Sequence, residues 1–289
     1  MNIPQYCNHQ NAIVEVTNNE LTRFFYKYLL QKAISVFRWE LPETWARDYF
    51  LYTLYCNGHV AVINTDKYGV IPQHCSLHGY DVMYRPTTAT INNPLLRGFN
   101  QLRIGKQCEI FKVNPDYSGI MDIVKTYGDV MALCVQTAGV NLLNSKLSYI
   151  FAAKTEASAK SFYKMMEDVI NGKPAVAVDK SLFNNDGSKA WDTFTQNVGQ
   201  NYIAGAVLSD LRKWEALFNT EIGIPNANTD KAERLIADEV NANNVETGTK
   251  CEMWLESFKK TCADCKKMFN IDISVDWRVP PVYNKGGVV

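Results

Sequence analysis

The chain has 289 residues, of which 46% are hydrophobic and 21% are charged, as in an ordinary globular protein. Thirty basic residues balance thirty acidic ones, which argues against a protein that grips nucleic acid tightly, because such affinity comes from neutralised phosphates. No secretory signal pattern opens the chain and no apolar run of about 18 residues occurs, so we expect neither secretion by that route nor a membrane span.

Two helices are expected at the N-terminal end. A capping box at residues 17–20 signals the start of the first, and aromatic residues keep helical spacing from there through Phe37. Pro42 is expected to start the second helix, because proline is tolerated in a first helical turn, and Gly58 to end it.

The middle of the chain changes character twice. Residues 59–113 contain short β-prone runs separated by turn residues, which indicates a small barrel or sandwich. A helix is expected over 127–147, then a strand over 147–153, a helix over 155–170 and a strand over 175–178. No glycine-rich phosphate-binding motif occurs at the strand-to-helix turn or elsewhere, so this unit is not expected to bind a nucleotide.

The C-terminal part is expected to be mainly helical. After a polar stretch at 181–197, a long helix is predicted over about 198–221. A further helix carries Trp254 at core spacing, and a strand over 271–277 precedes a tail with paired prolines and glycines.

The polar segment 223–246 separates these two helices. Pro225, Asn226 and Asn228 interrupt the first helix, and residues 230–240 have helical character but little apolar surface to bury. A long polar loop in a compact chain is usually functional or disordered, so this segment is a candidate functional loop.

The cysteines indicate buried thiols in a reducing compartment rather than a metal or redox site. Cys262 and Cys265 form a lone C-x-x-C on a helical core stripe, with no second ligand pair nearby in sequence. His74, Cys75 and His78 are the only other candidate ligand cluster, and no metal or cofactor is predicted. The eight cysteines are dispersed over positions 7, 56, 75, 108, 134, 251, 262 and 265.

The order of elements resembles the portal fold of tailed phages, a mixed α+β fold. The segments 223–228, 233–234 and 238–240 resemble the channel-loop region of the upper collar, or head-to-tail connector, proteins of small short-tailed phages with protein-primed genomes (Picovirinae-type). Weaker resemblances in the same order are an aromatic first helix, with Arg23-Phe24-Phe25 and Phe37-Arg38-Trp39-Glu40, a return strand at 173–176 and a C-terminal strand at 272–278.

The resemblance implies a helical stem, a small αβ clip, a β-rich SH3-like wing and a channel loop. It divides the chain into wing helices at 1–58, a β-rich wing module at 59–126, a stem helix at 127–147, the clip at 148–180, a polar lead-in and second stem helix at 181–222, the channel loop at 223–247 and a C-terminal wing helix, strand and tail at 248–289.

The resemblance also implies the assembly and its partners. It implies a ring of about twelve copies at a capsid vertex, assembled in the host cytoplasm, with double-stranded DNA in the channel. The implied protein partners are the major capsid protein, a tail or lower collar protein and a separate packaging ATPase, and no catalytic residues are implied. The residues implied to line the channel are Asn226, Asn228, Asp230, Lys231, Glu233, Arg234, Asp238, Glu239 and Asn243, and those implied to contact motor and tail are Lys154, Lys160, Lys164 and Lys173.

The charges of the loop are compatible with sliding DNA. Five acidic and two basic residues give residues 226–246 a net charge of −3, and few neutralised phosphates mean little friction. The alternative is that Asp230 and Arg234 pair on a solvated helix face. Residues 1–16 and 195–201 contain no lysine or arginine where family members carry basic residues, so the resemblance does not extend to an RNA contact by the N-terminus.

Two other functions remain open from the sequence. The first is another collar component of a virion, such as a tail adaptor, which would lack a clip inserted between two stem helices. The second is a thiol or metal-dependent enzyme using Cys262 and Cys265.

Overall fold

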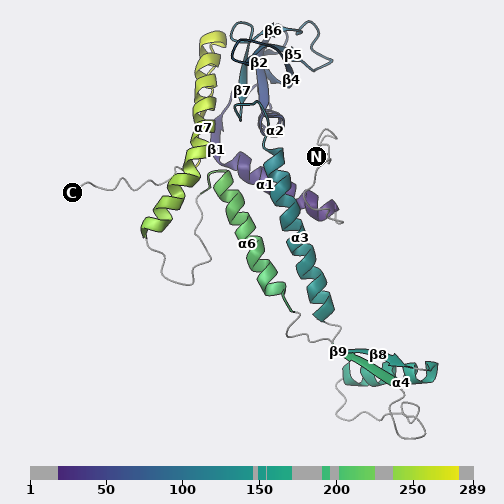
Figure 1. The fold of residues 1–289 in the computed structure, drawn as a ribbon. Helices are drawn as coiled ribbons and strands as arrows, with labels where there is room; N and C mark the ends of the chain where they lie inside the picture. Colours follow the sequence, from purple (N-terminus) through teal and green to yellow (C-terminus); the bar gives the residue numbers. More distant parts are fainter. Residues whose placement is uncertain are drawn as a thin grey trace. The chain divides into compact units, whose positions relative to one another are not determined.

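The computed structural model describes residues 19–145, 149–153, 155–170, 191–195, 202–224 and 237–279 (Figure 1). The chain forms two compact units. The first comprises Met1–Leu133 and Leu211–Val289, and the second is Cys134–Asp210. The second unit is therefore an insertion between two segments of the first.

The N-terminal elements of the first unit are helix α1 (Asn19–Ser35), strand β1 (Phe37–Glu40) and helix α2 (Arg47–Asn57). The prediction that the first helix includes Phe37 is wrong. Residues 37–40 alternate between buried and exposed, and they pair antiparallel with β10 (Ser274–Trp277), which lies more than 230 residues later. A strand buries Phe37 and Trp39 on one face, which a helix could not do at this spacing.

Helix α2 begins later and ends where expected. Pro42 lies in a turn, where its carbonyl oxygen accepts a hydrogen bond from the Trp45 amide, and the helix starts only at Arg47. At its end Gly58 adopts a left-handed conformation with φ 88° and donates its amide to Leu54. A Cβ at Gly58 would come within 2.1 Å of the Ser118 backbone, so only glycine fits here.

The β module consists of two three-stranded antiparallel sheets. The first has the order β3-β2-β7, with β2 His59–Thr65, β3 Gly69–Gln73 and β7 Cys108–Lys112. The second has the order β4-β5-β6, with β4 Cys75–Tyr80, β5 Pro86–Ile91 and β6 Leu102–Arg103. Short strands were predicted over residues 59–113, and these six strands lie in that range.

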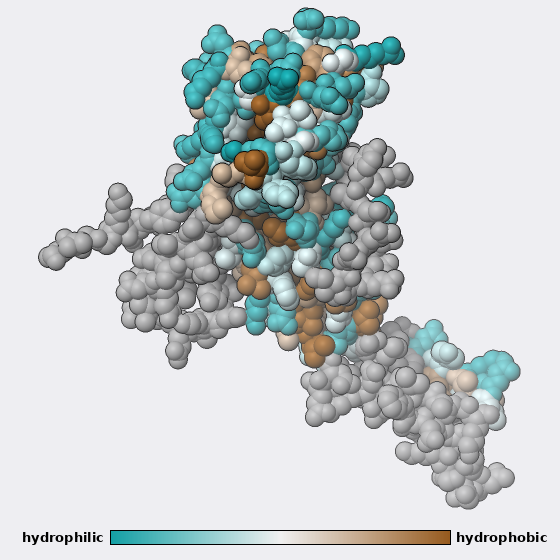
Figure 2. Space-filling view, turned by 45° about the horizontal axis from the view of Figure 1, so that its top comes forward, coloured by the Kyte–Doolittle hydropathy of each residue, from teal (hydrophilic) through white to brown (hydrophobic). Residues whose placement is uncertain are grey.

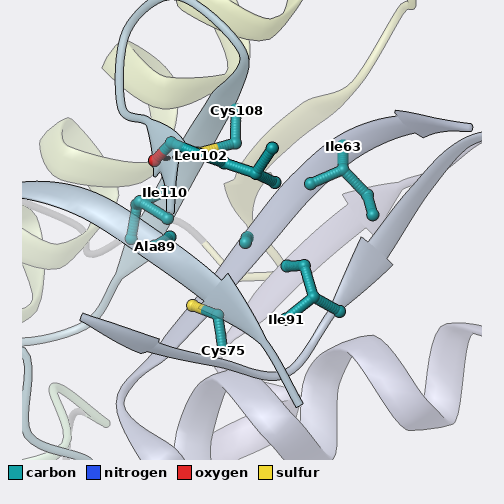
Figure 3. Packing of buried hydrophobic residues seen from close by; sticks show 8 residues of the cluster. Ile63, Cys75, Ala89, Ile91, Leu102, Cys108 and Ile110 are labelled. Atoms are coloured by element: carbon teal, nitrogen blue, oxygen red, sulfur yellow. Dashed lines mark hydrogen bonds between the residues drawn. The ribbon is translucent and has the colours of Figure 1, made fainter. Parts of the chain in front are cut away.

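The core of the β module is filled from both sheets. Figure 3 shows these side chains gathered in one cluster. Its members are Ala61, Ile63, Cys75, Ala89, Ile91, Leu102, Cys108 and Ile110, all at most 8% exposed. Cys75, weighed above as a candidate ligand, is therefore a core residue.

Helix α7 (Ala237–Phe269) and β10 complete the first unit. The helix packs on β7 and β10 and inserts Phe258 among buried rings. The Phe258 ring centroid lies 5.8 Å from that of Phe37, 5.0 Å from Trp39 and 6.4 Å from Tyr55. This aromatic core joins β1, α2 and α7. Because α7 begins at Ala237, the last part of the segment expected to be a loop to residue 247 is helical.

The second unit contains strand β8 (Tyr149–Ala153), helix α4 (Glu156–Ile170) and strand β9 (Trp191–Thr195). Strand β8 pairs antiparallel with β9, so the αβ unit extends past residue 180, where its boundary was expected. The strand predicted over 175–178 lies outside the described residues. Helices α3 (Met121–Ser145) and α6 (Ala204–Glu221) lead into and out of this unit. Helix α3 starts six residues before the predicted 127, and α6 starts after the predicted 198.

Candidate functional site: the paired helices and their loop

A part-buried ionic cluster fixes α1 to α6 in the first unit. Lys32 Nζ donates to Glu215 Oε1 at 2.6 Å and to Asn219 Oδ1 at 2.9 Å, and the Tyr28 hydroxyl donates to the same Glu215 oxygen. Burial would raise the pKa of Glu215, but the hydrogen bonds from Lys32 and Tyr28 and the charge of Lys32 outweigh it and lower that pKa. The carboxylate is therefore held in its charged form.

Helix α1 also contacts α3 closely. The Tyr26 hydroxyl donates to Asp129 Oδ1 at 2.5 Å, and both residues are buried. A Cβ at Gly128 would lie 2.6 Å from the Tyr26 ring, so a residue without a side chain permits this approach. On the same turn of α3, Tyr127 packs edge-on against Phe218 of α6, with 5.6 Å between ring centroids. Helix α1 thus holds both helices at their ends in the first unit.

In the second unit the same two helices are joined again. Asn141 Oδ1 of α3 accepts hydrogen bonds from the backbone amides of Ile203 at 3.0 Å and Ala204 at 3.1 Å. These amides belong to the start of α6, where backbone donors have no partner within the helix. Asn141 therefore supplies from α3 the cap that α6 needs.

Large apolar side chains are exposed on these helices. Figure 2 shows apolar residues gathered over the helical part of the visible face, while the β module is covered mainly by hydrophilic ones. In the second unit, six large apolar side chains of these two helices and the start of α6 are 45% to 63% exposed. The residues are Val140, Leu142 and Leu143 on α3, and Tyr202, Ile203 and Leu208 at and within α6.

The cysteines do not form a reactive or metal-binding site in the described part of the chain. Cys262 and Cys265 are buried on the core face of α7. Burial raises the pKa of the Cys262 thiol to about 12, and burial with nearby acidic groups also raises that of Cys265. Both thiols are therefore protonated and poor nucleophiles. No group of three potential metal ligands occurs among the described residues.

Residues 6–280 match the protein family described as Phage Connector (GP10). The chain belongs to the phage connector family. This match covers nearly the whole sequence and confirms the predicted portal or connector class. Members of that class are structural proteins of bacteriophage rather than enzymes.

Three solved structures are similar to the connector. A chain from the portal and tail of native bacteriophage P68 is 16% identical with a TM-score of 0.48, and the alignment covers 91% of this chain and 88% of that one. A chain from the virion of a native gene transfer agent particle is 11% identical with a TM-score of 0.47, covering 91% and 81%. An HK97 family phage portal protein from Corynebacterium diphtheriae is 12% identical with a TM-score of 0.38, covering 92% and 100%. The family assignment rests on the sequence match.

The residues predicted for the channel loop fall into two groups. Asn226, Asn228, Asp230, Lys231, Glu233 and Arg234 lie outside the described residues. Asp238, Glu239 and Asn243 lie in the first turns of α7, so they belong to a helix rather than to a loop.

The predicted clip lysines are only partly described. Lys160 and Lys164 lie on the exposed side of α4, and Lys160 Nζ pairs with Glu156 at 2.8 Å, with both side chains more than three-quarters exposed. Lys154 and Lys173 lie outside the described residues.

None of the helices in the described ranges has both the length and the apolar character to cross a membrane.

Sequence reasoning missed the Tyr28, Lys32 and Glu215 cluster of the connector. The spacing of Tyr28 and Lys32 puts them on one helix face, which was a visible signal. Their partner lies more than 180 residues away on another helix, and no local pattern connects them.

Proposed function

We propose that this connector assembles into a ring of about twelve copies at one capsid vertex, with double-stranded DNA passing through its centre during packaging and ejection. Within the inserted unit, residues 148–180 would be the clip that meets the tail or lower collar protein and a separate packaging ATPase, and the β module would meet the major capsid protein. We also infer that it belongs to the small short-tailed, protein-primed subgroup, on the motif at residues 223–240.

The observation that carries this proposal is the exposed apolar surface of α3 and α6 within the inserted unit. Leaving Leu143 63% exposed and Leu208 46% exposed costs free energy, because each buried apolar side chain contributes about 1.5–3 kcal/mol. Neighbouring copies in a ring would bury these side chains against one another. The pair of helices would then form the stem around the channel.

The small sheet supports the same assembly. Strands β8 and β9 pair only with each other among the described residues, and a sheet of two strands is marginal by itself. A strand from an adjacent copy would complete it and fix the ring.

Imaging of the purified protein in negative stain tests the assembly directly. We expect rings with a central hole, and sedimentation at micromolar concentration should show the corresponding large particle. Leu143→Asp with Leu208→Asp should abolish rings, whereas Leu95→Asp, at a site 82% exposed in the β module, should preserve them. A compact monomer for the unaltered chain would refute the proposal.

The loop before α7 is proposed to contact DNA transiently. Lys231 and Arg234 would touch phosphates, and the surrounding carboxylates would keep that contact weak. Replacing residues 225–236 by a neutral linker, which leaves α7 from Ala237 intact, should preserve rings but reduce retention of packaged genomes. Particles that hold full-length DNA as well as the unaltered ones would show that the loop is only a connection.

A further inference from the structure

The turn between β4 and β5 exposes four large side chains on five consecutive residues. Tyr80 is 66% exposed, Val82 95%, Met83 72% and Tyr84 85%. We call residues 80–84 the β4–β5 tip. Single exposed apolar residues are normal on a protein surface, but a continuous group marks an interaction site.

The tip is held rigid by Asp81. Its Oδ1 accepts hydrogen bonds from the backbone amides of Met83 at 2.8 Å and Arg85 at 3.0 Å, and its Oδ2 accepts one from Arg85 Nε at 2.9 Å. The backbone closes the turn with bonds from Tyr84 to Asp81 and from Asp81 to Arg85, both 3.0 Å. Because the turn is formed in advance, little conformational entropy is lost when a partner binds its apolar side chains.

Positive charge lies beside the tip. Lys112 Nζ sits 4.4 Å from the Tyr117 ring centroid. Burial lowers the pKa of Lys112, and the charges of Lys260 and Arg85 lower it further against the opposing effect of Asp116. Arg85 is already paired with Asp81 within the turn, which leaves Lys112 and Lys260 as neighbouring cations whose repulsion an acidic partner would relieve.

The area of the tip decides between a second copy and a different partner. Its four side chains offer roughly 500 Å² per copy, on a scale of about 150–250 Å² for a whole aromatic side chain. A stable pairwise interface needs about 800 Å² from each partner, so the tip is too small to hold copies together alone. A contact this small becomes effective when many tips of one ring bind at the same time.

We propose that the β4–β5 tip is a docking peg for a different protein, one that presents an apolar recess bordered by carboxylates. This inference rests on the proposed portal function, under which that partner is the major capsid protein around the vertex. The apolar side chains would enter the recess, and Lys112 and Lys260 would face its acidic border.

Binding of purified rings to purified major capsid protein of the same phage tests the peg. The variant combines Val82→Ser, Met83→Ser and Tyr84→Asn, since asparagine tolerates the positive φ of 56° at position 84. Leu95→Ser is the matched control, because Leu95 is equally exposed in the same β module. Ring formation is imaged for every variant, and thermal unfolding confirms that each is folded.

We expect the triple variant to form rings but to bind capsid protein at least about tenfold more weakly, as expected for loss of a central anchor. Leu95→Ser should bind unchanged, and Lys260→Glu should weaken binding and reduce its dependence on salt. If the triple variant no longer forms rings, the tip contacts a second copy and the proposal is overturned.

Equal binding by the triple variant, or no binding of capsid protein by unaltered rings, would overturn the peg while leaving the portal ring intact. Tip-dependent flotation of rings with phosphatidylcholine vesicles would assign the tip to lipid and also overturn it. Absence of rings from the unaltered chain would instead contradict the proposed function itself.

Discussion

Removing the charge of Glu215, or of its partner Lys32, should loosen the link between α1 and α6. The variants are Glu215→Gln, which keeps an acceptor oxygen for Tyr28, Lys32→Met, which keeps the apolar stem of the side chain, and the double variant. A double-mutant cycle over these proteins isolates the interaction between the two charges.

The expected coupling follows from the exposure of the pair. Exposed ion pairs contribute about 0.2–1 kcal/mol, and hydrogen bonds to charged groups about 1.5–3 kcal/mol. The side chains of Lys32 and Glu215 are 23% and 30% exposed with 2.6 Å between Nζ and Oε1, so they lie between these cases. We expect a coupling of about 1 kcal/mol and a loss of about 1–2 kcal/mol for Glu215→Gln at neutral pH.

The chain contains a matched control pair. Lys266 and Asp272 are also 2.6 Å apart, but their side chains are 65% and 86% exposed. Equal distance with greater exposure should give a coupling that is not measurable, because water screens the charges and flexible side chains must be ordered. The comparison separates the effect of burial from that of geometry.

The link should also depend on pH. The pKa of Glu215 is lower in the folded protein than in the unfolded chain. The stability that the charged carboxylate adds is therefore complete above the unfolded pKa of about 4.3, and it is lost as the pH falls through the pKa of the folded protein. Urea unfolding followed by tryptophan fluorescence, at one protein concentration and one oligomeric state, should therefore show a larger acid-dependent loss for the unaltered chain than for Glu215→Gln. A coupling near zero for Lys32 and Glu215, or one equal to that of the exposed control pair, would refute this reasoning.

Three further outcomes follow from packing. Gly128→Ala should lower the free energy of unfolding by about 1–3 kcal/mol, because the new methyl group meets the Tyr26 ring. The control is Gly139→Ala on the same helix, where the new methyl group meets nothing within 4 Å, and it should be neutral or stabilising by up to about 1 kcal/mol. Phe258→Ala should cost about 3–5 kcal/mol in chemical unfolding, and a loss under about 1 kcal/mol would mean that the aromatic core does not depend on this ring. Iodoacetamide at pH 8 should modify Cys262 only after denaturation, as read by peptide mass spectrometry, and rapid modification of the native protein would contradict its burial and raised pKa.

Local patterns predicted most of the helices and several turns. Helix α4 begins one residue after the predicted position, and α2 ends at Gly58 as expected, because glycine there adopts a conformation that other residues avoid. The cysteine spacing in α7 indicated a core stripe, and both cysteines are buried there, since helical periodicity is a property of neighbouring residues. These features are visible in any single stretch of the chain.

Boundaries failed where distant segments decide the conformation. Phe37 continues the helical spacing of α1, yet pairing with Trp277 makes it part of a strand. Residues 191–195 fall in the stretch predicted to be a polar lead-in, yet they form β9, for which β8 supplies the backbone partners. Strand pairing is a long-range interaction, so it cannot be predicted from the sequence of either strand alone.

The sequence by itself determined the family of this protein, through motifs and an order of elements that need no coordinates. Only the tertiary structure decided which side chains act together. It joined Lys32 to Glu215 across two helices, buried Cys75 in the β module and left Val82 to Tyr84 exposed on a rigid turn. Periodicity and turn residues act over a few positions, whereas burial and charge pairing depend on which segments the folded chain brings into contact.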